Sequence, residues 1–232
     1  MNGIPLSKYV LYVSMHRAST PGNSPSQSFL EQLKDHLLTR ICGEMRAGEG
    51  VHFSNAEHNR LYFQHDCIYK HAVLHVNYTT YDVQRQQDYI NPWTSKHFVM
   101  VHSNEDPISN QVRHPFWYAQ VLGIFHTQVQ INENGCLSAL VCMEFLWVCW
   151  LGLEPGYNHA SPRKWLDRVG FVPHDDADAF GFLDPSCVLR GCHLIPAFNQ
   201  GRTTELCPPS IARDDEGDWD CFYVNRWAST NE

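Results

Sequence analysis

The chain has 232 residues, of which 43% are apolar, 18% charged and 12% aromatic, and its formal net charge is −8. This composition is that of an ordinary globular protein and excludes a disordered or fibrous one. Duplex nucleic acid is bound mainly through Lys and Arg, so the acidic balance excludes a strongly DNA-binding surface. No apolar run approaches the roughly 20 residues that cross a bilayer, and the N-terminus lacks the apolar core of a signal peptide. We therefore expect an intracellular protein without a membrane segment.

The first 50 residues predict a tail and one helix. Residues 1–27 contain the stretch ASTPGNSPSQS and are expected to form a flexible tail. Residues 28–50 are expected to form an amphipathic helix and a linker, with capping-box spacing at Ser28 and Glu31 and a stop at Gly43. The apolar residues that recur at helical spacing are Phe29, Leu30, Leu33, Leu37, Leu38 and Ile41. This stripe either covers a face of the following domain or binds another chain, and the pattern does not choose between the two.

Residues 51–232 read as one β-barrel-like domain, because hydrophobicity alternates with period two from residue 51 onward. Short strands are expected around LYF and CIY, joined by a turn at His65 and Asp66, and then through Val73–Tyr78 and HFVMVHS. In HPFWYAQVLGIFH, Gly123 stands inside a strand and indicates a bulge or bend.

The stretch VCMEFLWVCWL is apolar at both odd and even positions, which predicts a strand that is buried on both faces. Further strands are expected in AFGFLDPSCVLRGCHLIPAF, on either side of a turn at Asp184 and Pro185, and in DCFYVNRW. The predicted fold class is mainly β: a small SH3-like barrel of one curved sheet, with an N-terminal amphipathic helix and long loops.

Residues with reactive side chains form no recognisable catalytic or metal-binding pattern. The nine cysteines have no C-x-x-C spacing, and Cys187, Cys192 and His193, with Cys207 and Cys221 downstream, make a poor zinc set. We therefore predict no catalytic residue, no metal and no cofactor. The alternative is a metal-dependent nuclease or transposase fragment that uses the acidic loop at Asp175, Asp176 and Asp178. Carboxylates within a single loop are more typical of a solvated turn than of a site built from several strands.

Aromatic residues beside hydrogen-bonding side chains are the remaining candidates for function. Most of the aromatic rings are expected to form the core. A surface where tyrosines meet polar groups is, however, typical of recognition. The predicted binding residues are Tyr78, Thr80, Tyr81, Asp82, Arg85, Trp93, Trp117 and Trp150.

Several ordered segments resemble a known protein group. VNYTTYDVQRQQDYINP, HPFWYAQVLGIFH, MEFLWVCWLG, AFGFLDPSCVLRGCHLIPAF and FYVN resemble a C-terminal region of proteins encoded by DNA transposons of mushroom-forming fungi, the Plavaka and Kyakuja-Dileera-Zisupton-like group. The similarity spans about residues 28–227. It implies that the acidic transposase residues lie upstream, outside this chain. Gln120 and Cys149 stand where that group is expected to have arginines, which weakens any contact with phosphate.

The order WYAQVLGIF, FLWVCWL and GFLDPSCVLRGCHLI is also similar to the bromo-adjacent-homology (BAH) domain, a β-barrel of chromatin proteins that binds histone tails or partner proteins. The two resemblances together imply a noncatalytic, nuclear interaction module with a histone tail or a transposase as its partner. They imply weak or no direct binding of nucleic acid.

Overall fold

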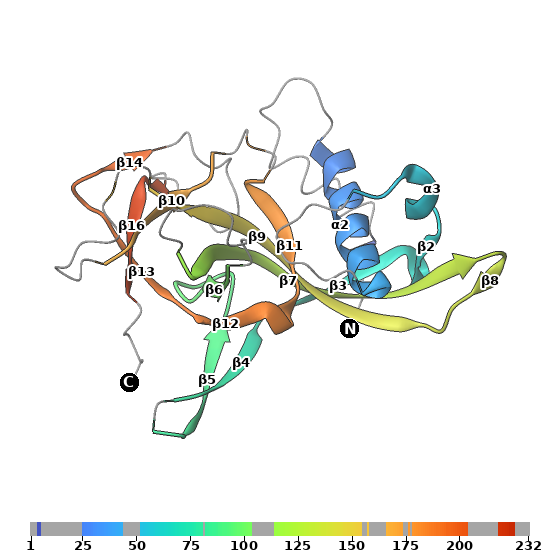
Figure 1. Cartoon of the computed structure of the whole chain (residues 1–232), viewed down its shortest axis with the longest axis horizontal. Coiled ribbons are helices and arrows are strands. Elements are labelled where there is room, and N and C mark those ends of the chain that lie inside the picture. Colours follow the sequence, from blue (N-terminus) through green and yellow to red (C-terminus); the bar gives the residue numbers. More distant parts are fainter. Residues whose placement is uncertain are drawn as a thin grey trace. The chain divides into compact units, whose positions relative to one another are not determined.

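The computed structural model describes residues 4–5, 25–43, 52–80, 82–103, 114–154, 157, 166–173, 176, 178–203 and 218–225. Within these residues the fold is mainly β, as the sequence predicts (Figure 1). The helices are α2 (Pro25–Cys42) and α3 (Asn55–His58), and the 3-10 turns are η1 (Gln64–Asp66) and η2 (Pro185–Cys187). The strands are β1 (Ile4–Pro5), β2 (Leu61–Phe63), β3 (Cys67–His71), β4 (Leu74–Thr79), β5 (Arg85–Ile90), β6 (Phe98–His102), β7 (Phe116–Glu133), β8 (Cys136–Leu137), β9 (Val141–Leu153), β10 (Arg168–Phe171), β11 (Phe180–Leu183), β12 (Val188–Gly191), β13 (His193–Pro196), β14 (Arg202–Thr203), β15 (Asp218–Trp219) and β16 (Cys221–Asn225).

Twelve of the described strands form one branched sheet along the path β1-β3-β7-β9-β10-β16-β13, with β2, β6, β8, β11 and β12 paired at its sides. β4 with β5, and β14 with β15, form two separate two-stranded sheets. The path ends on β1 and on β13, so the described strands do not close into a barrel. The predicted closed barrel is therefore not found among them. α2 shares a buried apolar core with β2, β3, β7 and β9, so apolar residues of these strands are covered by the helix.

The chain divides into two compact units, and β7 and β9 contribute residues to both. Unit 1 consists of Met1–His71, Gly123–Trp147 and Phe182–Pro185. Unit 2 consists of Ala72–Leu122, Val148–Gly181 and Ser186–Glu232.

The apolar stripe of α2 belongs to the core of unit 1. Leu33 and Leu37 are fully buried, together with residues of β2, β3, β7 and β9. The Phe29 ring lies 5.6 Å from the ring of Trp147 and 5.0 Å from that of Phe182, both edge-on. The apolar stripe, whose role the sequence did not decide, therefore packs against the sheet.

The start of α2 differs from the prediction, whereas its end agrees with it. The helix begins at Pro25, so Ser28 lies inside it and the predicted capping box is wrong. Proline suits the first helical position because that position has no intrahelical N–H bond to lose. Gly43 adopts a left-handed φ of 74° directly after the helix, as a stop signal requires. A capping box does occur at the start of α3, where Ser54 and Glu57 satisfy each other's backbone N–H groups.

Most predicted strands are confirmed. LYF, CIY and HFVMVHS lie in β2, β3 and β6, and the turn at His65 and Asp66 is η1, with φ of 57° and 50° at those residues. AFGFLDPSCVLRGCHLIPAF contains three strands instead of two, because β12 and β13 are separated at Cys192. The predicted N-terminal tail lies mostly outside the described residues, but Ile4–Pro5 pairs with β3.

β9 is buried on both faces over its central part, as predicted. From Phe145 to Leu151 every residue is buried or half-buried, whereas Val141 at its start is 43% exposed. On β7, a Cβ atom at Gly123 would overlap the ring of Phe125, so close packing accounts for this glycine. The register shift found in the sheet lies between β12 and β6, at Val188 and Arg190.

The core of unit 2 is built around β16. The ring of Phe222 lies 5.7 Å from the ring of Phe98 on β6 and 5.7 Å from that of Phe171 on β10. β16 pairs antiparallel with β10 and with β13. This arrangement ties the C-terminal strand to the middle of the unit.

His36 is a polar side chain against the core of unit 1. Its ring lies 6.0 Å from that of Phe182 on β11, and its Nε2 atom is shielded from solvent with no hydrogen-bond partner. Burial, aided by the charge of Arg40 and opposed by that of Asp184, lowers the pKa of His36 to about 4. Arg40 in turn forms a 2.7 Å ion pair with Asp184. His36 is therefore neutral in the folded protein at neutral pH.

Replacing Leu33 with alanine tests the position of α2. Because Leu33 is fully buried, Leu33→Ala is expected to lower the free energy of unfolding by about 2–5 kcal/mol in urea denaturation. The control is Leu140→Ala, in the same unit, where the side chain is 43% exposed. A loss at Leu33 no larger than the loss at Leu140 contradicts the packed helix.

Burial of neutral His36 predicts acid sensitivity. Its folded pKa lies below that of an unfolded histidine, so the unfolded state takes up the proton first. The resulting loss of stability begins as pH falls below about 6.5 and is complete below about 4. Between pH 7 and pH 5 we expect wild type to lose roughly 1–2 kcal/mol more unfolding free energy than His36→Gln. Urea titrations at both pH values measure this, with His193→Gln as the same change at an exposed position. Equal losses in wild type and His36→Gln contradict the assignment.

Candidate functional site

The hairpin of β4 and β5 in unit 2 contains most of the predicted binding residues. Its strands pair in continuous register from Leu74 opposite Ile90 to Thr79 opposite Arg85. Because side chains alternate along a strand, the hairpin has two faces. The inner face, which includes buried Val76 and Ile90, consists of Leu74, Val76, Tyr78, Gln86, Asp88 and Ile90. The outer face consists of His75, Asn77, Thr79, Arg85, Gln87 and Tyr89, all of them exposed.

The hairpin lies beside β12 (Figure 1), and side chains of its inner face attach it there. Asp88 Oδ2 accepts a hydrogen bond from the backbone N–H of Gly191 at 3.0 Å and one from Nε of Arg190 at 3.3 Å. The Arg190 guanidinium lies over the Tyr78 ring, 3.8 Å from its centroid. A Cβ atom at Gly191 would lie 2.9 Å from Cδ1 of Ile90, so the hairpin rests directly on the β12 backbone. Tyr78, one of the predicted binding residues, is part of this anchor, and its role in binding stays a prediction.

The turn of the hairpin is held by its own polar residues. The Thr80 hydroxyl donates to the Asp82 carboxylate and accepts the backbone N–H of Gln84 at 3.1 Å. Val83 at the tip has a left-handed φ of 65° and is 80% exposed. Thr80 and Asp82 thus shape the turn. Tyr81 lies outside the described residues, so its predicted role stays a prediction.

The outer face is a row of mutually hydrogen-bonded polar groups ending in an aromatic ring. Oε1 of Gln87 lies 3.0 Å from Nδ1 of His75, and Nε2 of Gln87 donates to Oδ1 of Asn77 at 2.8 Å. The Tyr89 ring packs edge-on against His75 at 4.8 Å and is 51% exposed. These cross-strand contacts hold several donors and acceptors in one plane and leave them accessible.

The three predicted tryptophans do not join the hairpin residues in one site. Trp93 is 49% exposed, in a turn where its backbone N–H donates to the side chain of Asn91. Trp117 on β7 and Trp150 on β9 pair edge-on at 6.1 Å and are half-buried. A Cβ atom at Gly181 would lie 2.9 Å from Nε1 of Trp150, so this ring is closely packed. The pair is part of the sheet.

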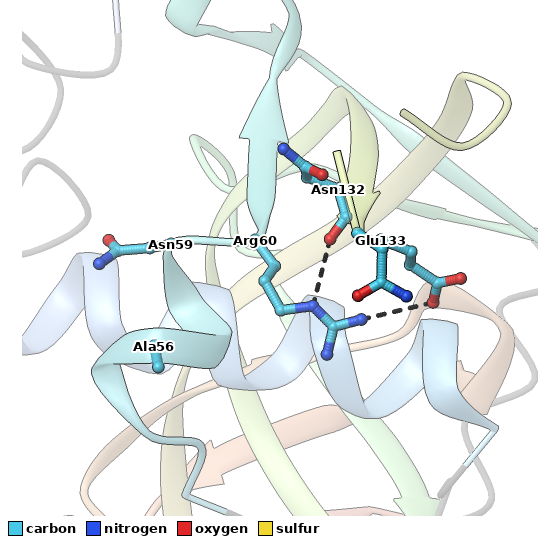
Figure 2. A pocket seen from close by; sticks show the side chains of 6 residues that line it. Ala56, Asn59, Arg60, Asn132 and Glu133 are labelled. Atoms are coloured by element: carbon cyan, nitrogen blue, oxygen red, sulfur yellow. Dashed lines mark hydrogen bonds and ion pairs between the residues drawn. The ribbon is translucent and has the colours of Figure 1, made fainter. Parts of the chain in front are cut away.

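A polar hollow in unit 1 is a feature that the sequence did not indicate (Figure 2). It measures about 650 Å³ and is lined by Ala56, Asn59, Arg60, Asn132, Glu133 and Asn134. Arg60 donates from Nε to the carbonyl of Asn132 at 3.2 Å and pairs with Glu133 at 3.4 Å. Both partners of this ion pair are at least half exposed. The only signal in the sequence is the Asn132–Gly135 turn, which predicts a bend but no hollow.

Thiol, histidine and carboxylate groups were the other candidates for chemistry in the described part of the chain. No group of three or more such side chains able to hold a metal ion occurs there. Burial raises the pKa of Cys192 to about 12, with a further contribution from Asp88, and burial likewise raises that of Cys221 to about 12. Both thiols are therefore protonated at neutral pH and are poor nucleophiles. Cys207 lies outside the described residues.

The acidic loop has the geometry of a turn where it is described. Asp176 Oδ1 accepts the backbone N–H of Asp178 at 3.0 Å, and the carbonyl of Asp176 accepts that of Ala179. Asp175 lies outside the described residues. The carboxylate of Asp176 is therefore engaged in shaping its own loop.

No protein-family profile, no curated protein and no solved structure matches the chain. None of the helices in the described ranges is long and apolar enough to cross a membrane.

Asp88 is expected to be the main anchor of the hairpin. Asp88→Ala leaves the N–H of Gly191 and the guanidinium of Arg190 without their acceptor, which should cost about 1–3 kcal/mol of unfolding free energy. Hydrogen exchange should also speed up selectively at the amides of β4 and β5. The control is Asp178→Ala at an exposed position of the same unit, expected to change stability by at most about 0.5 kcal/mol. Unchanged exchange in Asp88→Ala contradicts the anchor.

Proposed function

We propose that the chain is a noncatalytic interaction module of a transposon-derived protein of the fungal group that its sequence resembles. Its partner is a basic, extended protein segment, with a histone tail as the first choice and a transposase subunit as the other protein of this class. The observation that carries the proposal is the asymmetry of the β4–β5 hairpin. Its inner face is anchored on β12, and its outer face presents six exposed side chains in fixed register.

A rigid platform of this kind favours binding because little side-chain freedom is lost when a partner arrives. Gln87 is already held by His75 and Asn77, so the amide groups need not reorganise. Tyr89 supplies an exposed aromatic ring for a lysine or arginine side chain. The polar row beside it supplies acceptors for N–H groups of a peptide.

The charge of the chain supports a basic partner. The net charge of the whole chain is −8, which attracts a cationic peptide and repels the phosphates of nucleic acid. The outer face itself carries Arg85 and no carboxylate, so this attraction is long-range and comes from the rest of the chain. Nuclear localisation follows from the same proposal, because histone tails and transposase targets are found there. The nuclease alternative gains no support from the described acidic residues, since Asp176 is engaged in its own turn.

The test is binding of fluorescent histone H3 tail peptides, unmodified and lysine-methylated, measured by anisotropy at low and at moderate salt. Wild type is expected to bind at least one peptide, with affinity falling as salt rises. Tyr89→Ala is expected to weaken binding at least about fivefold, the equivalent of ~1 kcal/mol.

The matched control is Tyr62→Ala, because Tyr62 on β2 is 48% exposed and Tyr89 is 51% exposed. Circular dichroism and urea denaturation establish that both variants fold. Failure of wild type to bind any tail peptide would overturn the histone proposal. An equal loss in Tyr62→Ala and Tyr89→Ala would remove the outer face as the binding surface.

A further inference from the structure

Two histidines in unit 1 are placed side by side by the pairing of β3 with β7. Nε2 of His71 lies 2.6 Å from Nδ1 of His126. Tyr69 stands opposite His126 and His71 stands opposite Ile124, so the two histidines are diagonal neighbours on adjacent strands. Both side chains are half-buried, which leaves them accessible from solvent.

The ring of His126 is held in place before any ligand arrives. It stacks on the Tyr69 ring with 4.7 Å between centroids and an interplanar angle of 10°. Cross-strand stacking of this kind restricts rotation of the imidazole. Two imidazole nitrogens at hydrogen-bond distance share a single proton, because one ring must donate and the other must accept.

We propose that His71 and His126 form a binding site for a borderline divalent transition-metal ion, Zn²⁺, Ni²⁺ or Cu²⁺, which takes the place of the shared proton. Imidazole is the ligand these ions favour, whereas Mg²⁺ and Ca²⁺ favour oxygen. In a tetrahedral site, zinc–nitrogen distances of about 2.0–2.1 Å place two ligand nitrogens about 3.3 Å apart. The two nitrogens therefore need to separate by less than about 1 Å, which a small rotation of the His71 side chain provides while stacking keeps His126 in place.

The site has two protein ligands, with water completing the coordination. No third His, Cys, Asp or Glu converges with the pair in the described ranges. Glu144 on β9 exerts an electrostatic effect on His126, and its negative charge favours a cation nearby. Because only two coordination positions are filled by protein side chains, the ion exchanges readily. The site therefore differs from a structural zinc centre, which has four protein ligands. It uses none of the hairpin residues and goes beyond the proposed function.

The first experiment is titration of the metal-free, full-length protein with ZnCl₂, followed in two-bond ¹H–¹⁵N spectra of the histidine side chains at pH 7. The imidazole resonances of His71 and His126 are expected to shift together with one common saturation curve. MgCl₂ at the same concentrations is expected to leave them in place. This measurement needs no substitution, so it does not depend on the folding of a variant.

The second experiment is calorimetric Zn²⁺ titration of His71→Gln and His126→Gln. Loss of a residue that hydrogen-bonds to a metal ligand typically lowers metal affinity about 10–100-fold. Loss of a direct ligand is therefore expected to lower the Zn²⁺ affinity of this site at least about tenfold. The matched control is His193→Gln, an exposed histidine on β13, which should keep wild-type affinity. Unshifted His71 and His126 resonances, or equal affinity in wild type and both pair variants, would overturn the proposal. Peptide binding by the outer face is measured without added metal, so the two proposals fail separately.

Discussion

Burial of Phe145 organises unit 1. Its ring lies 5.5 Å from that of Phe125 on β7 and 5.7 Å from that of Phe182 on β11, and Phe182 in turn contacts Phe29 on α2. This cluster fixes where α2 lies, and α2 then positions Asp35. The carboxylate of Asp35 lies 2.6 Å from Nε2 of His58 and accepts the backbone N–H of Phe53 at 3.0 Å, which places α3 and the start of β2. A hydrophobic contact thereby determines the position of polar elements that have almost no core of their own.

In unit 2, a polar contact holds the hairpin of β4 and β5 in position. The hairpin of β4 and β5 has few buried apolar side chains, and Asp88 compensates by binding both the backbone and the side chain of β12. The half-buried carboxylate is stabilised here because one of its oxygens accepts two hydrogen bonds, one of them from a cationic guanidinium. The same alternation that turns Asp88 inward turns Gln87 and Tyr89 outward. The proposed recognition by the outer face therefore depends on a hydrogen-bond anchor on the opposite face of the hairpin.

The hydrophobic periodicity of the sequence was sufficient to predict the helix and strands that bury apolar side chains. The stripe of α2, the short strands β2, β3 and β6, and the two-sided burial of β9 all follow from it. β5 was not predicted, because RQQDYI alternates between half-buried and exposed polar residues and carries no hydrophobic signal. Ser28 was misread as a helix cap because a proline three positions earlier starts the helix equally well. The contact between Tyr78 and Arg190 was not predicted, because the two residues lie more than one hundred positions apart in the chain. Contacts between residues far apart in the chain, such as this one and the pairing of His71 with His126, produce no pattern in the local sequence.

Gly191 links the attachment of the hairpin to the chemistry of the next residue. Its missing side chain lets Ile90 sit against the β12 backbone, and Cys192 follows directly, shielded and close to Asp88. If the hairpin lifts away from β12, this thiol gains water and loses the neighbouring carboxylate, and its acidity rises. The rate at which a thiol reagent alkylates Cys192 would then follow how often the hairpin opens.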